Sequence, residues 1–167
     1  MTAESTPPRF RAPWGRELVV MSGIALLIIG VPTVMQWYQG HVVIGSVLLA
    51  ILVIPAMLTV RGYEVAPGEL RIRRLCWDTP WPLDGLAGAR LRPNVMAGSW
   101  RIWGNGGMFG FTGRFSNAAL GRYRAFVTDH KRTVVIESAH GILVVSPDRP
   151  EQFIDALTAA SAESPRW

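Results

Sequence analysis

The hydrophobic pattern divides the chain into two parts. From Leu18 to Val60 the sequence contains no Asp, Glu, Lys or Arg. A helix that crosses a bilayer needs about 20 apolar residues, so this run is too long for one span and about right for two. The stretch "QWYQGH" in its middle has the polar and aromatic residues expected where a chain turns at the headgroup level. We predict a hairpin of two transmembrane helices, with spans at about residues 17–36 and 41–60.

Two other interpretations compete for the first apolar run. A cleavable signal peptide is disfavoured because no A-x-A-like cleavage site follows Ile29 and a second apolar run follows at once. Two buried helices of a soluble protein are a weaker alternative, because about 40 uncharged residues need a far larger core than this chain provides. Pro32 and Pro55 predict kinks in the spans, which bilayer helices tolerate.

Beyond the hairpin the pattern changes to short alternating segments such as "ELRIRRLCW", "GRYRAFVTD", "RTVVIES" and "ILVVS". Turn signals separate them, including Pro67-Gly68 and a short link at His130-Lys131. In the first segment we expect Leu70, Ile72 and Cys76 on one face with Arg74, and Arg71 and Arg73 on the other. Links of hairpin length favour an antiparallel meander of six or seven strands, as a sandwich or barrel, over βαβ units.

The carboxy-terminal segment "SPDRPEQFIDALTAASAES" predicts one helix of about three turns. Asp148 and Glu151 form an acidic variant of the capping box, and Pro150 lies in the first turn, where its missing N–H costs little. We expect this helix to cover one open end of the sheet. The apolar residues that recur at helical spacing are Phe153, Ile154 and Leu157.

Four segments together resemble a known family: "YEVAPGELRIRR", "WPLDGL", "GMFGFTGRFSNAALGRYRAFVTDHKRTVVIES" and "GILVVSPDRPEQFIDAL". Over about residues 61–160 the chain resembles the bacterial pleckstrin-homology-like (PH-like) domain family, in its membrane-tethered form. The resemblance implies a barrel of about seven strands closed by a carboxy-terminal helix, and therefore the α+β class. A fold alone does not supply a function.

These elements predict four regions. Residues 1–16 are expected to be a disordered cytoplasmic amino terminus, and residues 17–60 the transmembrane hairpin. Residues 61–161 form the PH-like domain, and residues 162–167 a frayed tail.

The charge distribution predicts the orientation of the hairpin. The chain has 17 Lys and Arg against 12 Asp and Glu, a net charge of +5. Basic residues lie before the first span and after the second, whereas the turn between the spans has none. Because basic flanks stay in the cytoplasm, we predict a multi-pass protein of the plasma membrane with both termini and the PH-like domain cytoplasmic. Trp14 is expected to anchor the first span at that interface. The basic flanking residues are Arg9, Arg11 and Arg16 before the hairpin and Arg61, Arg71, Arg73 and Arg74 after it.

The glycine-rich stretch "WRIWGNGGMFGFTGRF", residues 100–115, does not match a nucleotide site. A phosphate loop needs a Lys after its last glycine, and the dinucleotide pattern that would begin at Gly104 meets Phe109 where glycine is required. No apolar helix follows. We therefore expect no cofactor, and glycines that permit positive φ or close backbone packing in a connection between strands.

No set of residues points to catalysis or to a metal. The candidates are dispersed, and Cys76 is expected to be a buried, inert thiol. The histidines fall at predicted turns and match no ligand spacing. We predict that the chain is not an enzyme; the alternative is a membrane-resident enzyme or transport accessory completed by a partner. The candidate residues are His130, His140, Cys76, Asp129 and Ser138.

Binding is the function that the sequence favours, with a protein partner or self-assembly as the expected ligand and no nucleic acid. The turn "APGE" has no Lys or Arg, so phosphoinositide clamping of the PH type is doubtful. Contact with anionic lipid headgroups is expected from arginines beside the hairpin, and partner binding from the aromatic-glycine segment, which can equally be core. The lipid-contact residues are Arg61, Arg71, Arg73 and Arg74. The partner-surface residues are Trp100, Arg101, Trp103, Phe109, Phe111 and Arg114.

Overall fold

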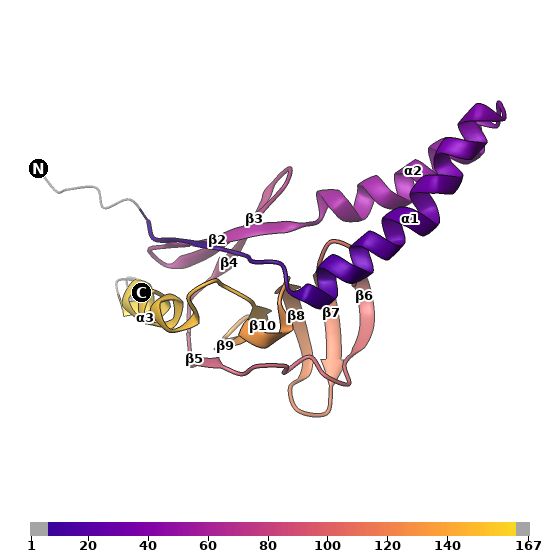
Figure 1. Cartoon of the computed structure of the whole chain (residues 1–167). Helices are drawn as coiled ribbons and strands as arrows, with labels where there is room; N and C mark the ends of the chain where they lie inside the picture. The colour runs from indigo at the N-terminus through magenta and orange to yellow at the C-terminus, as the bar shows by residue number, and fades with distance from the viewer. Residues whose placement is uncertain (1–6, 163–167) are drawn as a thin grey trace, which may run out of the picture.

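The structure is a computed structural model that describes residues 7–162, a helical hairpin attached to a β-rich domain (Figure 1). The short strand β1 (Arg9–Arg11) precedes the hairpin helices α1 (Arg16–Tyr38) and α2 (Val42–Met57), and α3 (Pro150–Ala162) closes the domain. The strands between α2 and α3 are β2 (Val60–Ala66), β3 (Glu69–Arg74), β4 (Asp78–Pro82), β5 (Gly88–Leu91), β6 (Trp100–Gly106), β7 (Phe111–Asn117), β8 (Gly121–Val127), β9 (Val134–Ser138) and β10 (Gly141–Val145). A 3₁₀ turn, η1 (His130–Arg132), lies between β8 and β9.

The two helices of the hairpin lie side by side and project away from the β-rich domain (Figure 1). The chain reverses between them at Gln39–His41, where Gly40 takes a positive φ of 80°. Gly45 of α2 permits the close approach, because a Cβ there would collide with the ring of Trp37 on α1. The helices therefore lie close to the predicted segments, although α2 ends three residues before the predicted boundary at Val60.

The domain is built from two sheets that enclose one main core. The first sheet has the order β1-β2-β3-β4, and the second has the order β5-β9-β10-β8-β7-β6. Helix α3 packs against β2, β3 and β5. This arrangement confirms the α+β class with a closing carboxy-terminal helix. The fully buried side chains of the main core include Tyr63, Leu70, Ile72, Phe126, Leu143 and Phe153.

The strand order differs from the predicted meander in two places, because β5 pairs with β9 instead of its sequence neighbours, and because β10 lies between β8 and β9. Strands β8 and β9 do not form a hairpin, because β10 lies between them and pairs with β8 in parallel. Residues 128–133, with η1, carry the chain past the position of β10. The expected turn at His130 is therefore a crossover. The described part of the domain also has nine strands after the hairpin, where six or seven were expected.

Residues 7–16 contain β1 and lead into α1, so the expected disorder of residues 1–16 is wrong for that part. Strand β1 pairs antiparallel with β2, and Phe10 is only 6% exposed and packs edge-on against Phe153 at 5.1 Å. A strand of three residues is too short to give a periodic signal, which explains why the sequence did not indicate it. Residues 1–6 lie outside the described chain.

Helix α3 confirms the predicted packing but not the predicted cap. Phe153 and Leu157 are fully buried, and Ile154 packs partly buried against the same core. The helix begins at Pro150, and the Asp148 carboxylate accepts a hydrogen bond from the backbone N–H of Arg11 instead of capping the helix. Asp148 thus fastens the amino-terminal segment. Of the expected tail, residues 163–167 lie outside the described chain.

Candidate functional site

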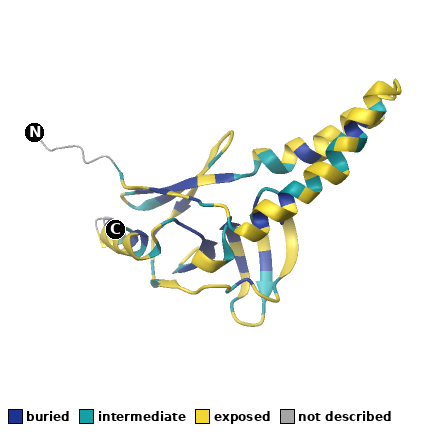
Figure 2. Ribbon diagram, in the orientation of Figure 1, coloured by how far each residue is buried: buried dark blue, intermediate teal, exposed yellow. Residues whose placement is uncertain are grey.

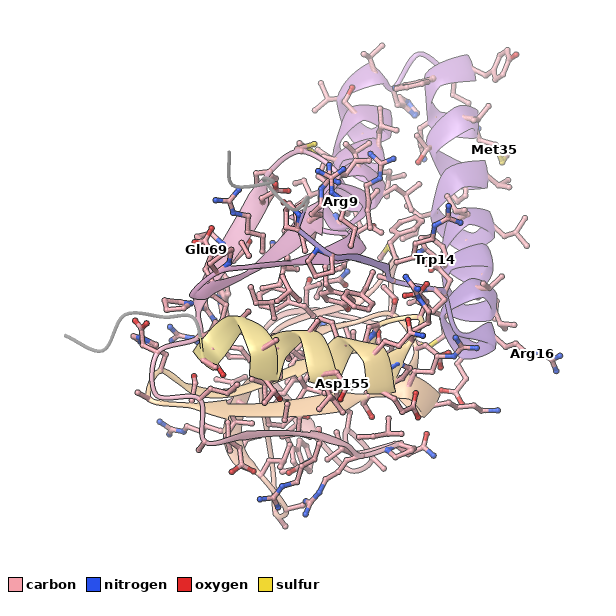
Figure 3. The ribbon with its side chains drawn as sticks, turned by 90° about the vertical axis from the view of Figure 1, so that its left-hand side faces the viewer. Arg9, Trp14, Arg16, Met35, Glu69 and Asp155 are labelled. Carbon is pink, nitrogen blue, oxygen red and sulfur yellow. The ribbon has the colours of Figure 1, made fainter. Side chains whose placement is uncertain are left out.

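Most residues of the hairpin are exposed or partly exposed (Figure 2), and the exposed side chains are largely apolar. Along α1 this exposure extends to Met35 near the far end, while Arg16 marks the end beside the domain (Figure 3). Helix α1, with 23 residues, is long and apolar enough to cross a membrane. Helix α2 has 16 residues, a length of about 24 Å against a hydrocarbon thickness of about 30 Å. The buried residues of the two helices are Leu18, Ser22, Thr33, Gly45 and Leu52.

The tip between β6 and β7 holds the base of α1. The Phe109 N–H donates to Ser22 Oγ at 3.0 Å, and the Phe109 ring lies 6.2 Å from that of Trp14. Phe109 has a φ of 59°, which a bulky side chain rarely adopts. Gly107 lies so close to Met21 of α1 that a Cβ there would meet the methionine methyl group. The tip is therefore a docking contact within the chain.

The predicted partner surface divides into two groups. Phe109 faces α1, and the Phe111 ring lies 4.3 Å from the ring of His130. Trp100 and Trp103, by contrast, are 82% and 78% exposed on β6, with Ile102 exposed between them. Strand β6 is also the free edge of its sheet. The described structure thus leaves an apolar strand edge uncovered.

The glycines of this segment allow its two strands to approach closely. Gly104 and Gly113 lie opposite each other in the β6–β7 pair, both with positive φ. A Cβ on either would collide with the backbone of the other strand. The expectation that the glycines serve close packing and positive φ is therefore confirmed at this pair, but the expected connection between strands is wrong here, because both glycines lie within paired strands.

The predicted lipid-contact arginines lie mostly on a basic surface beside the hairpin. A cavity of about 350 Å³ there is lined by residues of β1, β2 and β3. Arg71 is not among them: it pairs with Glu69, and that hydrogen bond is the main cause that raises the pKa of Arg71. Arg9 pairs with Glu64 at 2.8 Å. The arginines of the cavity are Arg9, Arg11, Arg61, Arg73 and Arg74.

A second basic region lies between the two sheets, where β4 does not cover β7 and β8. Two cavities of about 600 and 320 Å³ share Arg114 and Arg124 in their linings. Arg114 and Arg124 are direct partners across the β7–β8 pair. Arg122, two residues before Arg124, points to the same face of β8, as does the core residue Phe126. We call these two cavities together the inter-sheet groove.

The groove contains polar atoms that other described residues leave without hydrogen-bond partners. They are Trp81 Nε1, Arg74 Nε and Thr112 Oγ1, and each belongs to a residue that lines one of the two cavities. The Arg124 guanidinium lies 5.7 Å from the Trp81 ring, and that of Arg74 lies 4.8 Å from the Phe126 ring. Burial, and secondarily the charge of Arg124, lowers the pKa of Arg74. Positive charge is therefore concentrated in a partly desolvated place.

The candidate catalytic residues are not brought together. His130 and Asp129 line a cavity at the start of α1, whereas His140 lines the inter-sheet groove and approaches Asp84 at 3.8 Å. Burial lowers the pKa of His130, and the negative charges of Glu17 and Asp129, which raise it, offset only part of this effect. The expectation of a buried Cys76 is wrong: the chain bends after β3, and Cys76 is exposed in the β3–β4 loop. No cluster of three metal-ligating side chains occurs among residues 7–162.

A comparison with protein families decides the class of the domain. A family model described as "Bacterial PH domain" matches residues 61–161. The chain belongs to the bacterial PH domain family. Searches of curated proteins and of solved structures gave no match.

The bacterial PH domain match confirms the resemblance inferred from the sequence and runs from β2 to the end of α3. Strand β1 and the hairpin lie outside the matched residues. Yet β1 contributes Phe10 to the core and an edge to the first sheet. The folded bacterial PH domain of this chain therefore extends across the hairpin to include residues before it.

Sequence reasoning did not identify the inter-sheet groove, although a signal for it was present. In "GRYRAFV" the arginines Arg122 and Arg124 alternate with Tyr123 and Ala125. This alternation places the two arginines on the same face of the strand as Phe126. Two arginines on a core-facing register are unusual enough to indicate a site. The contribution of Trp81 depends on how the two sheets meet, which the local pattern does not contain.

Proposed function

We propose that this bacterial PH domain is a membrane-anchored binding module whose exposed β6 edge receives an extended segment of a protein. The observation that carries the proposal is the uncovered edge itself, with Trp100 and Trp103 beside unpaired backbone groups. A free strand edge can take an additional strand, with hydrogen bonds supplying affinity and flanking side chains supplying specificity. Exposed tryptophans are typical anchors of such contacts.

The anchor in this proposal is the α1–α2 hairpin, inserted as two spans. Its support is the exposed apolar surface and the length of α1. The shorter α2 requires either local thinning of the bilayer or a contribution from residues 58–60, both of which carry a modest energetic cost. Membrane insertion also gives the apolar side chains of the hairpin a favourable environment that water does not provide.

The orientation in this proposal places the domain in the cytoplasm, at the plasma membrane. The turn Gln39–His41 has no Lys or Arg, whereas arginines lie at the domain end of both helices. This asymmetry favours a cytoplasmic domain. The basic surface formed by Arg9, Arg11, Arg61 and Arg73 then lies beside the inner leaflet, where each basic residue contributes about 1 kcal/mol of attraction to anionic lipids.

Site-specific photo-crosslinking tests the β6 edge. We expect Trp100→p-benzoylphenylalanine, expressed in cells and irradiated in native membranes, to give a discrete adduct with a protein. An adduct of twice the mass of the chain identifies a second copy, and any other discrete mass identifies a different protein.

The matched control places the same photoreactive residue at Glu151, exposed on α3. Adding Trp103→Lys to the Trp100 variant is expected to abolish the adduct, because it puts a charge in the middle of the apolar edge. Equal labelling from both positions, or none from Trp100, contradicts the proposal.

A further inference from the structure

The inter-sheet groove carries an unusual concentration of unpaired positive charge. Among the described residues, none of Arg114, Arg122 and Arg124 forms an ion pair. Arg114 and Arg124 lie directly opposite each other in the sheet, an arrangement of like charges that destabilises a strand pair. Arg74 adds a fourth guanidinium close enough to Arg124 for their charges to interact. Among the described strand pairs of the second sheet, β7–β8 is the only one in which two like charges lie opposite each other.

Buried polar atoms in the same groove provide a second, independent observation. Trp81 is 4% exposed, and its indole N–H has no acceptor among the described residues. Leaving such a group unsatisfied costs about 1–3 kcal/mol. Trp81 faces the cavity that also contains Arg122 and Arg124. This donor needs an acceptor, and the guanidinium groups beside it favour an acceptor that carries negative charge.

The charge and the geometry together select the class of anion. We propose that the inter-sheet groove is a binding site for a phosphate monoester group, held by Arg114, Arg122 and Arg124 with the Trp81 indole N–H as a further donor. Three guanidinium groups exceed what a single carboxylate can neutralise, whereas a phosphate monoester carries a charge of about −1.5 to −2 and three acceptor oxygens. The residues that carry these donors come from three strands, β4, β7 and β8, and line the same cavity.

The surroundings of the groove suit an amphiphilic phosphate. Leu58, at the end of α2, lines the smaller cavity together with Trp103 and Phe126. The groove thus runs from the arginines to the place where the hairpin meets the domain. The phosphate monoester can belong to a lipid headgroup that enters from the membrane side or to a free phosphate ester, and both have the same chemistry at the arginines.

Binding measurements on the full chain in phosphatidylcholine nanodiscs test this site. The probes are short-chain phosphatidic acid, glycerol 3-phosphate and, as a charge-matched dicarboxylate, glutarate. We expect saturable 1:1 binding of phosphatidic acid that is at least tenfold tighter than that of glutarate, measured by titration calorimetry. If glycerol 3-phosphate binds as tightly as phosphatidic acid, the phosphate group alone is recognised. If glycerol 3-phosphate binds more weakly, the acyl chains of the lipid contribute to binding.

Two sets of variants distinguish specific binding in the groove from a general electrostatic attraction to the basic protein. Arg122→Gln with Arg124→Gln is expected to weaken phosphatidic acid binding at least tenfold, and Trp81→Phe several-fold. The control, Arg90→Gln with Arg92→Gln, removes the same charge from exposed positions on or next to β5 and should change affinity less than twofold.

A thermal unfolding scan shows that each variant is folded. Because Arg124→Gln removes the repulsion with Arg114, it is expected to keep or raise the unfolding temperature without ligand. No saturable binding of any phosphate probe, equal binding of glutarate, or equal losses from the two arginine pairs overturns the proposal. The crosslinking of the β6 edge does not depend on these results.

Discussion

Tyr63 is the residue that joins the two sheets by hydrogen bonds. Its hydroxyl donates to the Phe126 carbonyl at 2.6 Å and accepts from the Ser146 N–H at 3.0 Å, all in the buried core. Ser146 Oγ in turn accepts from the N–H groups of Thr128 and Asp129. The Ser146 hydroxyl therefore fixes the crossover that separates β8 from β9, and the Tyr63 hydroxyl links β2 to β8 and to the residue after β10.

Replacing this hydroxyl tests its contribution to stability. We expect Tyr63→Phe to lower the free energy of unfolding by about 1–3 kcal/mol, because a buried carbonyl and a buried N–H lose their partner. Denaturant titration in detergent micelles measures the change. Tyr123→Phe is the control: its hydroxyl meets only Ser99 in a less buried place, and the loss should be smaller.

The same residue predicts a dependence on alkaline pH. Burial raises the pKa of Tyr63 to about 12, against an ordinary value of 10.0. A raised pKa means that this contribution to stability is complete below pH 10 and is lost as pH rises toward 12. The Tyr63→Phe variant should therefore lose less stability than the wild type between pH 10 and pH 12. Parallel pH profiles for the two proteins would contradict this assignment.

Among the elements, β1 shows how a short segment completes the domain. The pairing of β1 with β2 is extended by bonds from the Ala12 N–H to Arg61 and from the Gly15 N–H to Thr128. These contacts hold the chain against the domain up to the start of α1 (Figure 3). The hairpin is consequently an insertion between two adjacent strands, and both of its ends are fixed.

Truncating the buried aromatic side chain of β1 tests this role. We expect Phe10→Ala to lower the free energy of unfolding by about 3 kcal/mol, because Phe10 belongs to the main core beside Phe153. Amide hydrogen exchange should increase at the β2 groups that pair with β1. The milder Phe10→Leu should cost less. If Phe10→Ala is as stable as the wild type, the segment before the hairpin is not part of the domain.

Elements with strong periodicity were predictable from the sequence, and those that depend on distant partners were not. The apolar runs located α1 and α2, and the spacing of Phe153 and Leu157 located the buried face of α3. The parallel pairing of β8 with β10 depends on contacts across the sheet, which hairpin-length links do not encode. Cys76 was misplaced because alternation was extended past the end of β3 into a bend.

The candidate site likewise has parts that the sequence predicted and parts that depend on distant contacts. The arginines near the hairpin and the tryptophans of β6 could be proposed from composition and position. Their separate roles could not, because Phe109 docks on α1 and Arg71 is occupied by Glu69 only once the chain has folded. The inter-sheet groove exists only because the two sheets meet incompletely beside β4.

At the scale of the whole molecule, three connections join the apolar hairpin to the bacterial PH domain. They are β1, the direct connection from α2 to β2, and the docking of the β6–β7 tip on α1. This coupling holds the domain in one orientation relative to the hairpin. In the proposed membrane-inserted state, the β6 edge and the basic surface therefore have defined positions with respect to the bilayer.

The central claim is that the hairpin crosses the plasma membrane twice and leaves the domain in the cytoplasm. Cys76, the single cysteine of the chain, is exposed on the domain and reports its side of the membrane. In a second protein, Cys76→Ser with Gln39→Cys moves the thiol to the exposed turn between the helices. We predict that a membrane-impermeant maleimide labels Cys76 only after cells are permeabilised, and labels the Gln39→Cys protein in intact cells. Labelling of Cys76 in intact cells, or of neither thiol until permeabilisation, would contradict the account.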